Sequence, residues 1–82
     1  MIYIKETFPN DNIAVIQVDG ILDEDSLLIL EEVCHRHLGK KKRVELDLHG
    51  LIHVSREGRN FLQEVENEGI IVNLPQLLKL PE

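Results

Sequence analysis

The spacing of apolar residues changes along this chain, and that change limits its fold more than any other feature of the sequence. Apolar and polar residues alternate over residues 2–8 and 43–48, and residues 13–18 and 70–74 form short apolar runs. Both patterns are typical of strands with at least one buried face. The turn-forming residues 9–12 separate the first two segments so closely that we expect them to pair as a hairpin.

Two longer segments have helical spacing instead. Asp23 and Ser26 are N-capping residues for the first, and Gly39 is its expected C-terminal stop. One apolar stripe runs along this helix and consists of Leu27, Leu30, Cys34 and Leu38. Ser55 is expected to cap a second helix over residues 56–68. The inner face of that helix consists of Phe61, Leu62 and Val65.

The order of these elements predicts the fold class. A short last helix is expected from Pro75 through Leu77, Leu78 and Leu80, which gives the order β-β-α-β-α-β-α. We therefore expect a single α/β domain over residues 1–82, with a small four-stranded mixed sheet and its helices mainly on one face. Because Gly50 interrupts the third strand, we also expect an irregular turn between Leu48 and Ser55.

The charge balance argues against nucleic acid as a partner. The formal net charge is −6, from 15 acidic and 9 basic residues, so the chain lacks the positive surplus that binds phosphates. Its basic run, residues 40–43, is typical of a solvated loop, with a nucleic-acid or lipid patch as the alternative. The single cysteine, Cys34, excludes an internal disulfide, and no apolar run is long enough for membrane insertion. We expect a cytoplasmic protein without a cofactor.

Three segments resemble the motifs of STAS domains, the family that includes the bacterial anti-sigma-factor antagonists. Gly20-Ile21-Leu22-Asp23 resembles the Gly-x-Leu-Asp segment before the first helix of the family. Val44-Glu45-Leu46-Asp47-Leu48-His49-Gly50-Leu51 resembles its central strand. Ser55-Arg56-Glu57-Gly58 stands in place of the family's Asp-Ser-Ser-Gly, and the match continues to the Pro75 turn. The resemblance therefore covers essentially the whole chain.

The resemblance implies a non-catalytic, regulatory role in signalling. STAS domains of anti-sigma-factor antagonists bind a kinase-like anti-sigma factor, and phosphorylation of the first serine in Asp-Ser-Ser-Gly breaks that complex. Here Ser55 falls on the family's aspartate, Arg56 on the acceptor serine and Glu57 on the second serine, and only Gly58 is retained. Because arginine has no hydroxyl, the resemblance supports the fold and a binding role without the phosphorylation switch. Ser55 is at most a poor substitute for the acceptor.

Family resemblance places the partner contact on the loop at Asp23 and on the start of the second helix. The expected partner-binding residues are Asp23, Ser55, Arg56, Glu57, Gly58 and Arg59. Gly58 would let a partner backbone approach, and Arg56 would either hold an acidic partner residue or lie solvated in the first turn. The sequence leaves three kinds of partner open: an anti-sigma kinase, a transport ATPase, or another STAS chain, including a homo-oligomer of this one.

A small hydrolase or metal-binding protein that uses His49, His53 and Ser55 is the alternative from another class. The two histidines flank a glycine-containing turn, but no third ligand stands at a zinc-like spacing. Ser55 lacks the glycines of a nucleophile elbow, and its capping role explains its presence. Cys34 lies on the apolar stripe and is expected in the core. The sequence therefore favours a binding module over an enzyme.

Overall fold

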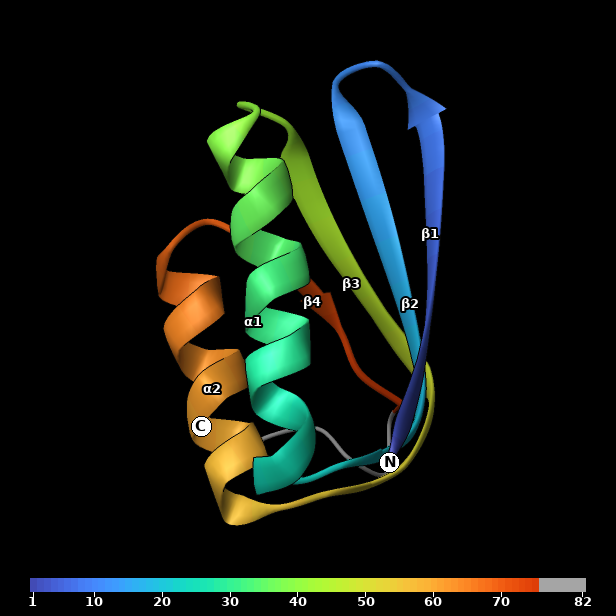
Figure 1. Cartoon of the computed structure of the whole chain (residues 1–82), viewed down its shortest axis with the longest axis vertical. Coiled ribbons are helices and arrows are strands. Elements are labelled where there is room, and N and C mark those ends of the chain that lie inside the picture. The colour runs from blue at the N-terminus through green and yellow to red at the C-terminus, as the bar shows by residue number, and fades with distance from the viewer. Residues whose placement is uncertain (76–82) are drawn as a thin grey trace.

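The computed structural model describes residues 1–75, which form one four-stranded sheet with two helices. The helices α1 and α2 lie side by side over one face of the sheet (Figure 1). In chain order the elements are β1 (Ile2–Asn10), β2 (Ile13–Leu22), α1 (Glu24–Gly39), β3 (Arg43–Val54), α2 (Arg56–Asn67) and β4 (Ile71–Asn73). This confirms the predicted layers. The predicted last helix, with Leu77, Leu78 and Leu80, lies outside the described residues.

The sheet has the strand order β1-β2-β3-β4 and is mixed. β1 and β2 pair antiparallel as the predicted hairpin, whereas β2 with β3 and β3 with β4 pair parallel. Each parallel connection passes through a helix, because parallel neighbours cannot be joined by a tight turn. The second and third predicted strands are therefore neighbours in one sheet, as expected.

The core lies between the sheet and the helices, as the predicted stripes require. The inward residues of the two central strands are at most 1% exposed: Ala14, Ile16, Val18, Val44, Leu46 and Leu48. Leu30 and Cys34 of α1 and the three predicted residues of α2 cover them. Burial, with smaller contributions from the carboxylates of Glu68 and Glu31, raises the pKa of the Cys34 thiol to about 12. Cys34 is therefore a neutral core residue.

The end of the third strand differs from the prediction. Instead of an irregular turn after Leu48, β3 continues to Val54 and stays paired with β2 through two bulges. Gln17 pairs with Asp47 but Asp19 with Gly50, so two residues of β3 stand against one of β2. The second bulge leaves Ile52 as an extra residue. Each extra residue adds one position between two side chains that face the core. The buried residues therefore recur every third position here, at Leu48, Leu51 and Val54.

The first helix ends at Gly39, as predicted, but the left-handed residue that caps it is not this glycine. Gly39 is still helical, and Lys41 instead takes the left-handed conformation, with φ of 60°. The Lys41 amide donates to the Leu38 carbonyl at 2.9 Å, and the Lys42 amide donates to the His37 carbonyl at 3.2 Å. These two bonds form a Schellman motif, whose left-handed position is usually a glycine. The chain places a lysine there instead.

No helix within residues 1–75 combines the length and apolar character needed to cross a membrane.

Candidate functional site

The two helices begin at the same edge of the sheet. β2 and β3 are parallel neighbours, and α1 and α2 follow their carboxyl ends directly, so both helix starts lie at the lower end of the view in Figure 1. The Ser55 amide donates to the Leu22 carbonyl at 2.9 Å and ties the start of α2 to the end of β2. The Asp23 loop and the Ser55 segment, which are far apart in sequence, therefore form one surface.

Asp23 is the N-cap of α1, as its sequence position predicts. Its Oδ1 accepts hydrogen bonds from the Ser26 amide at 3.2 Å and from the Ser26 hydroxyl at 2.9 Å. The N-terminal ammonium group lies 3.8 Å from Oδ2. The hydrogen bonds from Ser26, together with this ammonium group, lower the pKa of the Asp23 carboxyl. The side chain is thus a carboxylate at neutral pH that is fixed by its capping contacts.

Ser55 is the N-cap of α2, which was also predicted. Its backbone is extended, with φ of −70° and ψ of 170°, and its Oγ accepts a hydrogen bond from the Gly58 amide at 3.0 Å. The residue is half-buried. Its hydroxyl oxygen is therefore turned toward the helix backbone that it caps.

Gly58 has a different role from the predicted one. It is buried, and a Cβ placed on it would lie 3.0 Å from the Leu22 carbonyl oxygen and 3.0 Å from Val54 Cγ1. The expectation that a partner backbone approaches Gly58 is wrong, because the backbone of this chain at Leu22 already occupies that space. The missing side chain lets α2 start directly against the end of β2.

Three charged side chains complete the first turns of α2. Arg56, Glu57 and Arg59 are exposed, and no ion pair within the described part of the chain involves them. The first backbone N–H groups of a helix have no intrahelical acceptor, and the helix dipole places partial positive charge at the same end. The surface around Arg56 is therefore suited to an anionic group.

Comparisons with known proteins give structural matches only. No protein-family model matches the chain, and no curated protein matches it in sequence. A crystal structure of an anti-sigma factor antagonist from Mycobacterium paratuberculosis superimposes with a TM-score of 0.77. The superposition covers 90% of this chain and 68% of that one at 18% identity. The chain has a STAS-like fold.

A second structure supports the same assignment. It is an uncharacterized protein of the DUF3478 family from Shewanella loihica, described as having a SpoIIAA-like fold. It superimposes with a TM-score of 0.62 at 12% identity and covers 90% of this chain and 68% of its own. At these identities the likeness concerns the STAS-like fold alone, and the roles of individual residues rest on the local geometry.

Two exposed apolar residues beside the predicted site escaped the sequence analysis. Ile21, at the end of β2, is 41% exposed, and Ile52, at the end of β3, is 76% exposed. The second bulge of β3 turns Ile52 outward, and Ile21 pairs with the neighbouring His53. For Ile52 the sequence signal is the change from alternation to a spacing of three after Leu48, which fits a bulged strand, whereas Gly50 favours a turn. No local pattern marks Ile21.

The groups of the alternative hydrolase or metal site are not assembled in this STAS-like fold. His49 Nδ1 lies 2.6 Å from Asp47 Oδ1, and its hydrogen bond lowers the pKa of the Asp47 carboxyl. Among the hydrogen bonds of residues 1–75, none joins Ser55 to His53. Nor does this part of the chain contain three histidine, cysteine or carboxylate side chains close enough to hold a metal ion. The observed contacts of Ser55 and His49 are capping and pairing contacts.

Proposed function

We propose that this chain is a non-catalytic protein-interaction module that binds a regulatory partner through the shared start of its two helices. The proposed binding surface consists of Asp23, Ser55, Arg56, Glu57 and Arg59, whereas Gly58 lies buried beneath it. In this proposal residues 1–82 act as one cytoplasmic domain. The partner is a protein of the anti-sigma kinase type, a transport ATPase or another STAS chain.

The observation that carries the proposal is the exposed guanidinium of Arg56 in the first turn of α2, at the sheet edge where Ser55 is hydrogen-bonded to Leu22, the residue before Asp23. A cation at a helix start is somewhat unfavourable against the dipole, and an anionic contact offsets that cost. An acidic partner residue supplies that contact through two parallel hydrogen bonds. The exposed Ile21 and Ile52 add apolar area to the same end of the sheet, as in the centre of many protein interfaces.

The binding test uses the full chain and the purified partner that a pull-down from the source cell identifies. Arg56→Ala is expected to weaken the complex by about 2 kcal/mol or more, roughly 30-fold in Kd, and Arg56→Glu by more than that. Arg43→Ala removes another exposed arginine, at the start of β3, and is the matched control. If Arg56→Ala and Arg56→Glu both bind like the parent chain, the start of α2 is not the interface.

The proposed module works without the serine phosphorylation switch. Arg56 cannot accept a phosphoryl group, and the Ser55 hydroxyl is half-buried against the Gly58 amide. Incubation of the purified chain with ATP and candidate anti-sigma kinases should leave both positions unmodified by mass spectrometry. A kinase substrate with an accessible serine serves as the positive control. Stoichiometric phosphate on Ser55 would show that the acceptor has shifted by one residue and that the switch is present.

A further inference from the structure

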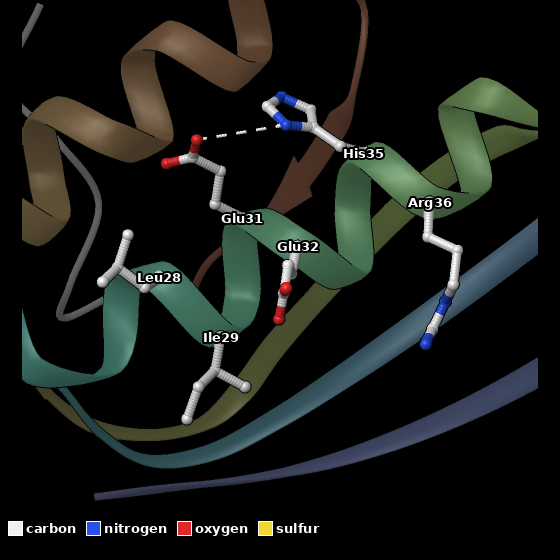
Figure 2. A pocket seen from close by; sticks show the side chains of 6 residues that line it. All are labelled: Leu28, Ile29, Glu31, Glu32, His35 and Arg36. Atoms are coloured by element: carbon white, nitrogen blue, oxygen red, sulfur yellow. Dashed lines mark ion pairs between the residues drawn. The ribbon is translucent and has the colours of Figure 1, made fainter.

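The outer face of α1 carries apolar residues that the other elements of residues 1–75 leave exposed. Leu28 is 75% exposed and Ile29 is 55% exposed, although both are aliphatic. Figure 2 shows them around an open hollow with charged residues of the same helix. We use the name α1 outer face for the exposed residues Asp25, Leu28, Ile29, Glu32 and Arg36, which recur every three or four positions and so share one side of the helix.

Charge is distributed unevenly along this face. Its first turn carries the carboxylate of Asp25, beside that of Glu24, and Glu32 lies near the middle of the helix; none of these three takes part in an ion pair within residues 1–75. Its C-terminal half carries Arg36 and continues into the basic residues 40–43. The helix dipole accounts for acidic and basic ends. It does not account for exposed aliphatic residues in the acidic half or for Glu32 and Arg36 near the middle.

We propose that the α1 outer face binds the same face of a second copy, with the two helices antiparallel. An antiparallel two-fold arrangement brings each acidic half against the basic half of the other copy, so every contact occurs twice. A pairing centred near Cys34 sets Glu32 opposite Arg36 and Leu28 opposite Lys40. The aliphatic stem of a lysine can cover a leucine while its ammonium group stays in water.

Arg36 can make this contact without losing its contact within the chain. One of its nitrogens, Nη2, donates to Glu6 Oε1 at 3.0 Å, and its side chain is 54% exposed. A guanidinium group has five N–H donors, so a second carboxylate can bind at the same time. Arg36 would then join Glu6 of its own chain to Glu32 of the other.

The size of the helix predicts a weak dimer. The 16 residues of α1 span about 24 Å. A single pair of helices of this length forms an interface at or below the roughly 1,200 Å² at which stable complexes begin. We therefore expect reversible association that strengthens at low salt, because the exposed pairs are screened by ions. This dimer does not rest on the proposed partner site, which lies at the shared start of α1 and α2 and centres on Arg56.

The test is a reciprocal charge swap measured by sedimentation equilibrium at low salt with the full chain. The parent is expected to dimerise with increasing concentration. Glu32→Arg and Arg36→Glu each place like charges opposite one another, so each variant alone should raise the dimer Kd by about tenfold or more. An equimolar mixture of the two variants restores both pairs and should dimerise close to the parent level. Glu66→Arg, the same charge change on the exposed face of α2, should leave the association unchanged.

Two further measurements separate weaker dimerisation from loss of folding and test the apolar part of the contact. Urea unfolding of each variant shows whether it folds, and Leu28→Ala should weaken the dimer through the loss of apolar contact alone. A parent that stays monomeric at low salt at the highest soluble concentration would overturn the proposal and leave the face to a different protein. A mixture that associates no better than its two components would overturn it as well, because that result would exclude the reciprocal pairing.

Discussion

At the scale of single residues, a small cluster of side chains around Glu6 and His37 joins the edge strand to the first helix. His37 Nε2 lies 2.6 Å from Glu6 Oε1, and the His37 side chain is only 5% exposed. The Phe8 ring meets the His37 ring edge-on at 5.5 Å between centroids, and Lys42 lies over Phe8 at 5.6 Å. Through this cluster, side chains of the edge strand β1 pack against the C-terminal part of α1. It also makes the Glu6 carboxylate a stabilising group.

The Glu6 contact predicts a pH-dependent stability difference. The hydrogen bond from His37, followed by the contacts with Arg36, lowers the pKa of Glu6 below its usual 4.5. Because the pKa is lower in the folded state, the stabilisation is present above pH 4.5 and is lost as the pH falls through the folded value. Because the Glu6 side chain is partly exposed to solvent, Glu6→Gln should lower the free energy of unfolding at neutral pH by about 0.5–1 kcal/mol.

Urea unfolding of the parent and of Glu6→Gln from pH 7 downward measures this difference. The gap between them should narrow as the pH falls through the lowered pKa of Glu6, because protonated glutamate and glutamine are then alike in charge. Glu45→Gln, which changes a carboxylate of β3 that no ion pair of residues 1–75 involves, is the control. A gap that is constant with pH would mean that the Glu6 carboxylate contributes nothing through its charge.

Lys41 predicts a stabilising substitution. A left-handed backbone costs an L-residue about 1–2 kcal/mol, and glycine avoids most of this cost while losing some entropy on folding. Lys41→Gly should therefore raise the free energy of unfolding by about 0.5–1 kcal/mol in urea unfolding. Lys40→Gly removes the same charge at a residue with φ of −92° and should give no gain. Equal effects of the two changes would mean that charge, and not backbone conformation, decides the result.

At the scale of elements, β3 differs most from its sequence pattern. Gly50 does not end the strand. It provides room for Asp19, since a Cβ at position 50 would overlap Asp19 Oδ1 and lie 2.5 Å from its Cγ. The first bulge therefore depends on a glycine that faces a specific side chain of the neighbouring strand.

This packing predicts a non-additive pair of substitutions. Gly50→Ala should lower the free energy of unfolding by about 0.5–1 kcal/mol, because Asp19 must rotate out of its position. Adding Asp19→Ala should recover part of that loss, since only the Asp19 Cβ, at 3.1 Å, would remain close. A double-mutant cycle in urea measures the coupling. Strictly additive effects would show that Asp19 is not what Gly50 accommodates.

The same elements show what sequence reasoning could reach. The caps at Asp23 and Ser55 and the buried Cys34 follow from local spacing, so they were predictable. The left-handed conformation of Lys41 is not predictable from the sequence. Glycine is the usual residue at that position, so the sequence assigns the position to Gly39. The buried side of Gly58 was missed because it depends on contact with Leu22, which only the packed sheet creates. The candidate site was thus located by motif, while its geometry required tertiary contacts.

At the scale of the whole molecule, stability should be greatest in the two central strands. β2 and β3 are paired on both sides and carry fully buried residues, whereas β1 is paired on one side and mostly exposed. Hydrogen exchange should therefore give β1 amides protection at least about tenfold lower than that of β2 amides. Amides of α1 serve as an internal reference. Equal protection in β1 and β2 would mean that the edge strand opens only with global unfolding.

The second bulge of β3 also marks a position at which homologous chains can lose or gain one residue. Ile52 is an extra residue between the Leu51 and His53 pairs, and the nearest residues on either side that face the core are Leu51 and Val54. Deleting Ile52 would leave one outward residue between two inward ones, which is the regular alternation of an unbulged strand. Such a deletion removes a residue without reversing any core position and without moving Ser55 from the end of β2. Insertions and deletions among homologues should therefore collect at this point, and an alignment that treats it as a loop would misplace the α2 motif by one residue.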